Sequence, residues 1–429
     1  MNYLELAKTY QTPLYVYDLA QITQAFHTIK DAFKARKSLI CYALKANSNL
    51  SIIHHLAQLG SGADCVSIGE VKRALKAGIP KYKIIFSGVG KSDSEIMQAL
   101  ESDILLINVE SEAELMRIES LAKNLNKVAR ISVRVNPNID AKTHPYISTG
   151  LSENKFGVDI EQAKSMYIFA KNAPHLEPVG IHFHIGSQLT ELAPISQAAQ
   201  KIAELTHSLL ALKIDLKFFD VGGGIGIRYS DENLIEPYDY AQAILSALYG
   251  LDLTIICEPG RFLVGESGVL LTSVLYEKYN GKKRFVIVDA AMNDLMRPAL
   301  YNATHEVCLL DSKHTNAKNK GDCIDTSFTP QAQESLCDVV GPICESSDFL
   351  AKNVHLPHLC AGDVLMIKNA GAYGASMASN YNTRPRPAEV AFMGEEVYLI
   401  KHRESFEEMT RDEEDLLQHS IDSTYKGSE

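Results

Sequence analysis

The strongest constraint on this chain is a repeated alternation of short apolar segments and helix-like patterns between residues 39 and 260. Eight apolar or β-branched segments occur there: LICYALKA (39–46), ADCVS (63–67), IIFSG (84–88), LLINV (105–109), RISVRVN (130–136), GIHFHIG (180–186), FFDVGGG (218–224) and TIICEPG (254–260). A doubly wound sheet usually has five or six strands. Eight strand–helix units over about 220 residues therefore predict an α/β fold with a (β/α)8 barrel of the TIM type.

The pattern changes after residue 265, where alternating strands and tight turns replace the strand–helix units. Hairpins are expected to turn at Asn280-Gly281 and at Gly394, because glycine adopts the backbone angles of tight turns between antiparallel strands. The N-terminal segment TPLYVYD has the pattern of a strand and is expected to join this second region. We therefore predict a barrel over residues 25–265 and a β-rich, Greek-key or sandwich-like domain built from residues 1–24 and 266–429.

Composition excludes several classes of protein. The chain has 429 residues, 46% of them hydrophobic, and a net charge of −11 without long runs of either sign, which argues against a nucleic-acid surface. Neither a leader pattern nor a long apolar stretch is evident, so we expect a cytoplasmic protein with no membrane partner. The eight cysteines are dispersed without a CxxC pair, which predicts reduced thiols rather than zinc ligands or disulfides. The polar run at 311–335 is expected to be a surface loop.

Polar and glycine residues stand at the carboxyl ends of the predicted barrel strands, where barrel enzymes build their active sites. In chain order they are Lys45, Asp64, Ser87, Asn108, Asn136, His184, the glycines 222–224 and Glu258. Lys45 is the most informative, because burial lowers the pKa of an amine and lets it attack a carbonyl as the neutral form. A lysine at a strand end can also simply reach out to water, but the common position of all these residues favours a site.

Three further patterns have more than one interpretation. The glycine run 222–226 follows the seventh predicted strand, where barrels often bind phosphate through backbone N–H groups, although it could be only a tight turn. His182 and His184 alternate onto one face of their strand and fit core or stacking histidines better than a metal pair, because no cluster of carboxylates or thiolates accompanies them. Glu258 could form a plain ion pair with Lys45. It could also pair with the ring nitrogen of pyridoxal phosphate while Lys45 holds the cofactor's aldehyde.

Several long motifs resemble one enzyme family. YALKAN around Lys45 and the runs HFHIGSQ, VGGGIG, EPGR and GPICESSD are similar to the alanine-racemase-fold, pyridoxal-phosphate-dependent decarboxylases over nearly the whole chain. Within that family, the closest resemblance is to the members that convert meso-2,6-diaminopimelate to L-lysine and CO2, the last step of lysine biosynthesis. The motifs that carry it are VNPNIDAKTHPYISTG, ENKFG, VDAAMNDLMRPALY, CES at 344–346 and GAYGASMASNYNTRPRPAEV. The run at 311–335 is longer than is usual in the family.

The resemblance implies roles that composition and spacing do not assign. It implies that Lys45 forms the internal aldimine with pyridoxal 5'-phosphate, that His184 stacks on the cofactor ring and that Glu258 pairs with the pyridine nitrogen. The other cofactor-binding residues that it implies are Asp64, Ser187, Gly223, Gly224, Pro259, Gly260, Arg261 and Tyr373. The substrate-binding residues that it implies are Arg261, Arg297 and Tyr301 for the distal carboxylate, Glu345 for the distal ammonium, and Tyr373. Cys344 is implied to return a proton to the α-carbon at the site of a partner subunit, in a homodimer with shared active sites.

Alternatives remain at this point. Taken singly, Cys344 could be a buried thiol, Arg297 a surface ion pair and Tyr373 a core residue. Within the same fold, the substrate could instead be carboxynorspermidine or a basic amino acid such as ornithine. Ornithine, however, has no distal carboxylate for Arg297 and Tyr301 to bind. A cofactor-binding regulator without catalysis would not need to keep Lys45, Glu258 and Cys344.

Overall fold

The computed structural model describes residues 1–140, 154–310 and 335–413. They form two compact units. The barrel unit contains Asp18–Gly268 and Asn369–Ser376, and the sheet unit contains Met1–Tyr17, Val269–Lys368 and the chain from Met377 onward. The division therefore falls near residues 18 and 268 rather than 25 and 265, and the short segment 369–376 groups with the barrel. Most of the polar run at 311–335 and the chain after residue 413 lie outside the described residues.

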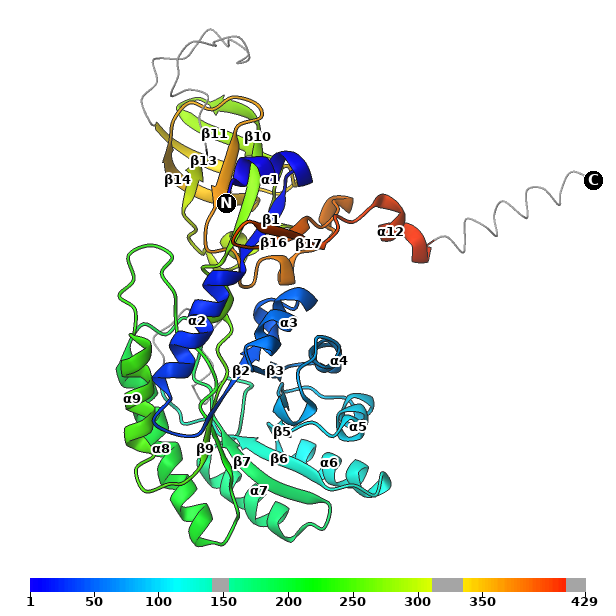
Figure 1. Ribbon diagram of the computed structural model, residues 1–429, viewed down its shortest axis with the longest axis vertical. Coiled ribbons are helices and arrows are strands. Elements are labelled where there is room, and N and C mark those ends of the chain that lie inside the picture. The colour runs from blue at the N-terminus through cyan, green and yellow to red at the C-terminus, as the bar shows by residue number, and fades with distance from the viewer. Residues whose placement is uncertain (141–153, 311–334, 414–429) are drawn as a thin grey trace, which may run out of the picture. The chain divides into compact units, whose positions relative to one another are not determined.

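The barrel unit is a closed ring of eight parallel strands, β2 to β9, in chain order, as the sequence predicted (Figure 1). β2 pairs with both β3 and β9, which closes the ring. The strands are β2 (Ser38–Ala43), β3 (Gly62–Cys65), β4 (Ile84–Phe86), β5 (Leu106–Val109), β6 (Ala129–Arg134), β7 (Leu176–His182), β8 (Phe218–Asp220) and β9 (Thr254–Cys257). The helices are α2 (Leu19–Ala32), α3 (Leu50–Gln58), α4 (Ile68–Lys76), α5 (Asp93–Ser102), α6 (Glu112–Asn124), α7 (Ile160–Asn172), α8 (Leu192–Ala211), α9 (Pro237–Ala247) and α10 (Arg261–Val264).

Local sequence explains where these elements begin. β3, β4 and β5 are buried along their whole length, as expected for apolar strands covered by helices on the outside and side chains on the inside of a barrel. Ser67 and Ser111 cap α4 and α6 by accepting hydrogen bonds from the backbone N–H groups of Glu70 and Glu114. A serine oxygen satisfies a helix N–H that would otherwise lack a partner, so both helices start where the sequence predicted.

Most barrel strands end a few residues before the ends of the apolar sequence segments that predicted them. β2 ends at Ala43, and a 3-10 turn, Leu44–Ala46, carries Lys45. β8 ends at Asp220 and β9 at Cys257, so the glycine run and Glu258 lie in the loops that follow. β7 is shifted toward the N-terminus of the prediction and ends at His182 rather than residue 186. Lys45, His184, the glycine run and Glu258 are therefore carried by the turns beyond the strands, whereas Asp64 and Asn108 lie within β3 and β5.

The sheet unit is a nine-stranded sheet with the order β14-β13-β11-β10-β1-β16-β17, in which β15 pairs with β10 and β12. Its strands are β1 (Leu14–Asp18), β10 (Gly268–Asn280), β11 (Lys283–Val288), β12 (Val307–Leu309), β13 (Ser335–Val340), β14 (Phe349–Leu356), β15 (Val364–Ile367), β16 (Ala388–Met393) and β17 (Glu396–Lys401), and its helices are α1 (Tyr3–Tyr10), α11 (Arg297–Tyr301) and α12 (Phe406–Thr410). The hairpins β10–β11 and β16–β17 confirm the predicted turns. β1 lies between β10 and β16, so the N-terminal strand joins the sheet as predicted.

Cysteine usage departs from the sequence prediction at one position. Cys41, Cys65, Cys257, Cys308, Cys337 and Cys344 are free thiols, whereas Cys360 is disulfide-bonded. Cys323 lies outside the described residues. None of the helices in the described part of the chain has the length and apolar character needed to cross a membrane.

Candidate active site

Lys45 lies at the mouth of the barrel in an ion pair with Asp64 on the neighbouring strand. Its Nζ is 2.6 Å from Asp64 Oδ2; the lysine side chain is 39% exposed and that of Asp64 is fully buried. The other oxygen, Asp64 Oδ1, is buried without a hydrogen-bond partner among the described residues. The turn after Lys45 is fixed by Tyr42, whose hydroxyl donates to the carbonyl oxygen of Asn47 over 2.8 Å. The side chain of Lys45 is thus accessible, while the backbone turn that carries it is held in place.

The protonation of Lys45 differs from the expectation. Burial is the largest single influence on the pKa of Lys45 and would lower it. The Asp64 carboxylate, together with smaller contributions from Tyr373 and Glu258, outweighs burial and raises the pKa above its usual value. In this chain Lys45 is therefore an ammonium stabilised by Asp64. The prediction that desolvation makes it a neutral amine is wrong for the structure as it stands.

His184 is neutral and accepts a hydrogen bond from the glycine run. Burial and the nearby positive charges of Arg134 and Lys45 lower the pKa of His184 well below its usual value. The Gly223 N–H donates to His184 Nδ1 over 3.2 Å, so the neutral ring carries its proton on Nε2. A neutral, oriented imidazole is suited to stacking on a flat ring.

The glycine run is packed so closely that side chains would not fit. A Cβ on Gly223 would lie 2.2 Å from the carbonyl oxygen of Glu258, and one on Gly224 would lie 2.3 Å from the carbonyl oxygen of Gly186. Gly224 also has φ +113°, which other residues rarely adopt. The loops after β7, β8 and β9 are therefore held against each other by backbone contacts, with their N–H groups close to the barrel mouth.

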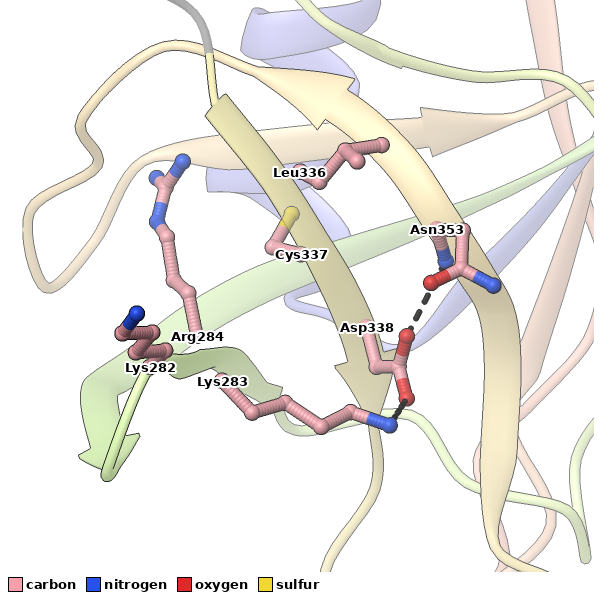
Figure 2. Close-up of a pocket in the computed structure, with 7 residues that line it drawn as sticks. All are labelled: Lys282, Lys283, Arg284, Leu336, Cys337, Asp338 and Asn353. Carbon is pink, nitrogen blue, oxygen red and sulfur yellow. Dashed lines mark hydrogen bonds and ion pairs between the residues drawn. The ribbon is translucent and has the colours of Figure 1, made fainter.

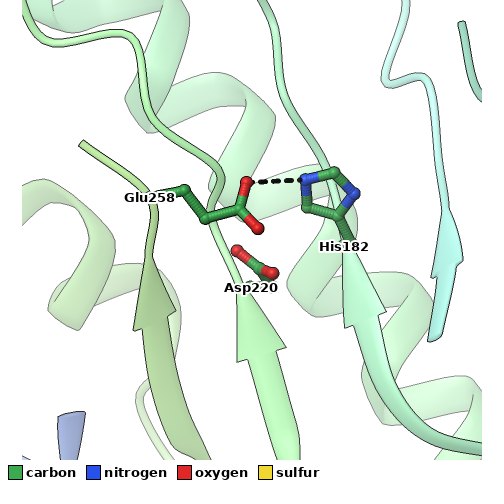
Figure 3. Close-up of side chains that lie close together, drawn as sticks. All are labelled: His182, Asp220 and Glu258. Carbon is green, nitrogen blue, oxygen red and sulfur yellow. Dashed lines mark ion pairs between the residues drawn. The ribbon is translucent and has the colours of Figure 1, made fainter. Parts of the chain in front are cut away.

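Glu258 lies in a buried cluster with His182 and Asp220, which come from three adjacent strand ends (Figure 3). His182 Nε2 is 3.5 Å from Glu258 Oε2. Burial alone would raise the pKa of Glu258, but His182, Lys45 and Asp220 outweigh it and keep the pKa below the usual value. Glu258 is therefore a carboxylate in the interior of the barrel mouth.

Arg261 begins α10 and gathers several site residues around its guanidinium. Nη2 donates to Ser187 Oγ over 3.1 Å and Nη1 donates to the Tyr229 hydroxyl over 2.7 Å. The guanidinium carbon lies 4.9 Å from the ring centre of Tyr373 and 5.7 Å from that of Tyr229, within the range of cation–π contacts. The Arg261 side chain is buried, so these contacts fix its position. Pro259 and Gly260 pack under β2: the Ala43 N–H donates to the Pro259 carbonyl oxygen over 3.2 Å.

The segment 369–376 brings Tyr373 to the Lys45 turn. The Tyr373 N–H and the Ser376 hydroxyl both donate to the carbonyl oxygen of Ala46, over 2.7 Å and 3.0 Å. Tyr373 has φ 56°, an uncommon angle for a bulky residue that typically costs about 1–3 kcal/mol. Hydrogen bonds to Ala46 sustain this conformation, and backbone strain of this kind is common at functional sites.

The sheet unit carries the remaining predicted site residues. Arg297 and Tyr301 are the first and last residues of α11 and, four residues apart, lie on one face of it. Arg297 is buried; its Nη1 lies 2.8 Å from His305 Nε2, and His305 Nδ1 lies 2.8 Å from the Lys368 carbonyl oxygen. A carbonyl can only accept, so Nδ1 carries the proton and Nε2 accepts from Arg297.

Cys344 and Glu345 are exposed on a loop that buried contacts hold in place. The Asp348 carboxylate accepts from the N–H groups of Met292 and Ile343, over 2.8 Å and 2.7 Å. The Cys344 N–H donates to Asn382 Oδ1 over 3.0 Å, and Glu345 accepts from the Tyr381 hydroxyl. Cys344 is therefore not the buried thiol that its residue type alone suggested, and two functional groups of this loop face outward.

A cavity of about 310 Å³ also lies in the sheet unit, lined by Lys282, Lys283, Arg284, Leu336, Cys337, Asp338 and Asn353 (Figure 2). Two of its cations are paired within the protein: Lys283 Nζ lies 2.6 Å from Asp338 Oδ2, and Arg284 pairs with Glu277. Asp338 Oδ1 accepts from the Asn353 N–H over 3.0 Å. Paired charges of this kind stabilise the β11–β13–β14 region rather than offer a ligand an open partner.

Comparison with known proteins decides the family. Residues 19–265 match the family described as pyridoxal-dependent decarboxylase, pyridoxal binding domain. The diaminopimelate decarboxylase of Campylobacter jejuni is 58% identical over 419 residues, covering 97% of this chain and 100% of the relative. That of Helicobacter pylori strain J99 is 59% identical over 410 residues, covering 96% and 97%. The chain belongs to the pyridoxal-dependent decarboxylases.

Solved structures agree with this membership. The crystal structure of diaminopimelate decarboxylase from Helicobacter pylori complexed with L-lysine matches this decarboxylase with a TM-score of 0.90 and 59% sequence identity, covering 96% of this chain and 100% of that one. The barrel with an added sheet is therefore the fold of the family, as the motifs led us to expect.

The residues at the barrel mouth fit pyridoxal phosphate, the cofactor of this decarboxylase. Lys45 supplies an amine beyond a strand end, and the glycine loops bring backbone segments together where no added Cβ would fit; the N–H groups of Gly222 and Gly223 donate to Asp220 and His184. Glu258 Oε1 is a buried oxygen without a hydrogen-bond partner among the described residues. A buried carboxylate oxygen in this state needs a donor, and a protonated pyridine nitrogen is one.

Sequence reasoning found most of the barrel cluster but missed two of its members. The structure brings together Lys45, Asp64, His184, Ser187, Gly223, Gly224, Glu258, Pro259, Gly260, Arg261 and Tyr373 in the barrel unit, and it holds Arg297, Tyr301, Cys344 and Glu345 in the sheet unit. Asp220 and Tyr229 were not predicted. Asp220 ends β8 two residues before Gly222, so the strand-end rule could have found it, whereas no local signal marks Tyr229.

Proposed function

We propose that this decarboxylase converts meso-diaminopimelate to L-lysine and CO2. The observation that carries the proposal is the 58–59% identity, over nearly the full chain, to diaminopimelate decarboxylases from two organisms. Similarity of this extent spans both the barrel unit and the sheet unit. An L-lysine complex of one such relative is consistent with lysine as the product here.

The barrel unit is proposed to hold the cofactor. Lys45 Nζ would hold the aldehyde of pyridoxal phosphate, and Asp64, 2.6 Å from it, would keep the nitrogen protonated when the lysine is free. His184 would stack on the ring, because its neutral imidazole is oriented by Gly223. Ser187, the glycine loop 222–224 and the backbone at 258–261 would hold the phosphate through the Ser187 hydroxyl and backbone N–H groups other than those of Gly222 and Gly223, which donate to Asp220 and His184.

The distal end of the substrate is proposed to determine specificity. Arg297 and Tyr301 offer a guanidinium and a hydroxyl from one face of α11, and Arg261 offers a second guanidinium. A guanidinium binds a carboxylate through two parallel hydrogen bonds, which fits a substrate that keeps a second carboxylate far from the reacting carbon. Glu345 would bind the distal ammonium, and Tyr373 would contact both ligands.

Loss of CO2 requires that the scissile bond be oriented and that the electron pair be accepted. When bound, pyridoxal phosphate supplies an electron sink, which is most effective while its ring nitrogen stays protonated. Glu258 would maintain that proton because it is an ionised carboxylate with low solvent exposure. Firm binding of the distal carboxylate would hold the departing carboxylate in one orientation. The Cys344 thiol would then deliver a proton to the α-carbon.

Two rival substrates are available within the same fold. Ornithine lacks the distal carboxylate that Arg297 and Tyr301 would bind, and carboxynorspermidine is disfavoured by the extent of identity to diaminopimelate decarboxylases. Release of CO2 from meso-diaminopimelate, ornithine and carboxynorspermidine should be measured side by side. The proposal requires turnover of meso-diaminopimelate well above the other two, and preference for either rival would contradict it.

The assembly is proposed to be a homodimer with shared active sites. The exposure of Cys344 and Glu345 on the surface of the sheet unit supports this. In a two-fold dimer such a loop can complete the site of the partner subunit. A biosynthetic reaction of this kind is expected to take place in the cytoplasm.

A further inference from the structure

The carboxyl ends of β7, β8 and β9 bring together three buried groups of which only one has a proposed role. His182 Nε2 or Nδ1, Asp220 and Glu258 offer polar atoms that all lie within 4.8 Å of one another (Figure 3). Glu258 has the proposed role of partner to the cofactor's ring nitrogen. Asp220 is 1% exposed and has no role in the mechanism described so far.

The two carboxyl groups of this cluster leave oxygens without partners. Asp220 Oδ1 accepts from the Gly222 N–H over 2.9 Å, but Asp220 Oδ2 has no hydrogen-bond partner within the described part of the chain. The same is true of Glu258 Oε1. Figure 3 shows the two carboxyl groups facing one another, with His182 beside Glu258. Unsatisfied buried oxygens are costly; a proton on Asp220 Oδ2 could be donated to Glu258, whose carboxylate keeps further lone pairs for the cofactor's ring nitrogen.

The charges around the cluster do not allow both carboxyl groups to be ionised. The positive charge of Lys45 acts on Glu258, but Asp64 already pairs with Lys45. The thiols of Cys41 and Cys257 and the phenol of Tyr240 are buried and lie within electrostatic reach of the cluster. Burial, together with Asp220 and Glu258, raises the pKa values of all three, so they stay neutral. Two ionised carboxylates at this separation in a buried site repel strongly, and one of them takes up a proton.

The surroundings favour Asp220 as the protonated partner. Burial and then the charge of Glu258 raise the pKa of Asp220 well above its usual value. Glu258 has His182 on one side and Lys45 on another, and these keep its own pKa low. We therefore place the proton on Asp220 rather than on Glu258.

We propose that Asp220 is a positioning residue that stays protonated and donates a hydrogen bond to Glu258, so that Glu258 remains an oriented carboxylate toward the cofactor's ring nitrogen. This deepens the cofactor-binding role proposed for Glu258 and rests on it. His182 holds the other side of the same carboxylate. The ring nitrogen then meets a fixed negative charge, and its proton is retained without the cluster taking up or losing one.

A divalent metal is the competing explanation, because one imidazole and two carboxylates are also a ligand set for zinc. Zinc ligands lie about 2.0–2.2 Å from the ion, so a metal would draw these atoms together. It would also occupy Glu258 and compete with the cofactor. The metal explanation requires Asp220 to be ionised, whereas the proton-sharing explanation requires it to be neutral. The charge of the Asp220 side chain therefore distinguishes the two explanations.

Two substitutions test that charge. Asp220→Asn is a neutral isostere: its Oδ1 can accept from the Gly222 N–H, and its Nδ2 can donate to Glu258. We expect its dissociation constant for pyridoxal phosphate to stay within about 3-fold of wild type. Asp220→Ala removes the donor and should raise that constant about 10- to 100-fold, as for loss of a hydrogen bond to a charged group. Equal weakening in both variants, or none in either, would overturn the proposal.

A second measurement does not depend on binding or on how well Asp220→Ala folds. The infrared difference spectrum between the wild-type holoenzyme and Asp220→Asn at pH 7 should contain the C=O band of a carboxylic acid, shifted in D2O. A difference spectrum with only carboxylate bands would mean that Asp220 is ionised and would refute the proposal. The proposal also fails if Zn²⁺ binds one-to-one to wild-type protein stripped of cofactor and this binding is lost in Asp220→Asn. Neither measurement uses a substrate, so a different substrate would leave this inference intact.

Discussion

At the scale of single residues, Lys45 illustrates how a pair sets chemistry that neither member has alone. A buried amine would be neutral, but Asp64 lies 2.6 Å from its Nζ and makes the ammonium the stable form. The sequence marked both residues as strand-end groups but could not give their separation. A pKa depends on the distance to neighbouring charges and on burial. The prediction of a neutral Lys45 could therefore be corrected only once the folded structure was known.

Lys45→Ala should abolish both the visible absorption of the purified protein and its turnover. The amine is the only group proposed to bind the cofactor covalently, so its loss leaves the cofactor held by weaker contacts. Absorption spectra and CO2 release check this. Lys72→Ala, which removes an exposed lysine of α4, is the matched control and should behave as wild type. Full activity of Lys45→Ala would rule out the assignment.

His305 is expected to orient Arg297 through its unprotonated Nε2, 2.8 Å from the guanidinium. His305→Leu removes that acceptor and should raise the KM for meso-diaminopimelate about 10-fold or more while changing kcat less, because a hydrogen bond to a charged group is lost. In His305→Gln the amide oxygen can still accept from Arg297, so its KM should stay within a few-fold of wild type. Steady-state kinetics of the three proteins check this.

Two outcomes would contradict the role of His305. One is an unchanged KM in His305→Leu, which would mean that Arg297 is held by other contacts or does not bind substrate. The other is an equal rise in both variants, which would point to packing rather than to the acceptor. Arg297→Ala should give a larger rise in KM than either variant.

The residues that sequence reasoning missed lie where local patterns carry no information. Asp220 was passed over because the glycines that follow it gave a stronger signal for a phosphate site. Tyr229 reaches the site through the Arg261 guanidinium, 32 residues further along the chain. Contacts of that sequence separation depend on how loops cross the barrel mouth, which spacing does not reveal.

At the scale of elements, apolar runs located all eight barrel strands but misjudged their ends. In the β7 region, Ile181, Phe183 and Ile185 alternate as in a strand, yet β7 ends at His182. All three are buried, because the turn beyond the strand also packs into the core. Burial, not strand geometry, produces the pattern there, and alternation alone cannot separate the two.

Gly223→Ala should disrupt the loop after β8. The added Cβ would lie 2.2 Å from the carbonyl oxygen of Glu258, and backbone cannot yield as a flexible side chain would. We expect cofactor binding to weaken at least 10-fold, or the melting temperature to fall by several degrees. Gly90→Ala, where a Cβ meets nothing within 4 Å, is the control. Wild-type behaviour of Gly223→Ala would show that the loops can separate without cost.

Glu404 links the segment before β16 to the one after β17 and should make stability depend on pH. Its carboxylate accepts from Asn380 Nδ2 over 2.6 Å and from the Arg386 N–H over 2.9 Å. Burial would raise the pKa of Glu404, but its bonds to Arg386 and Asn380 outweigh burial and lower the pKa to about 2. A depressed carboxyl pKa stabilises the fold above the unfolded value, about 4.3, and this stabilisation is lost as pH falls toward 2.

Glu404→Gln should therefore lower stability by about 1–2 kcal/mol at pH 7, allowing for solvent screening of the half-exposed Arg386. The difference in melting temperature between wild type and variant should shrink steadily from pH 6 to pH 3. Glu395→Gln, at an exposed carboxylate in the β16–β17 turn, should show no such trend. A difference that is constant with pH would exclude ionisation as its cause.

At the scale of the whole molecule, the change from strand–helix units to hairpins indicated the two-part organisation, but not the exchange of short segments. Residues 369–376 follow β15 in the sheet unit, yet they group with the barrel. A Cβ on Gly371 would lie 1.9 Å from the Val264 carbonyl oxygen, so only glycine allows this approach. The segment delivers Tyr373 to Lys45 across more than three hundred residues of sequence, and no short-range pattern predicts such a pairing.

The final prediction concerns the proposed sharing of active sites between subunits. Lys45 is in the barrel unit, and Cys344 is exposed on a loop of the sheet unit. If Cys344 serves the partner's site, Lys45→Ala and Cys344→Ala should each be inactive alone and should rescue each other when unfolded together and refolded as a mixture. In a mixed dimer one site combines the intact Lys45 of one chain with the intact Cys344 of the other.

Random pairing makes about half of the dimers mixed, and one of the two sites in each mixed dimer is intact, so the mixture should recover about one quarter of wild-type activity. Chains with different affinity tags allow heterodimers to be isolated, and these should have about half of the wild-type activity. If each site is built within one chain, no mixed dimer contains an intact site. Isolated heterodimers as inactive as their parents would therefore refute shared sites, while leaving the roles of Lys45 and Cys344 within one chain open to the single-variant measurements.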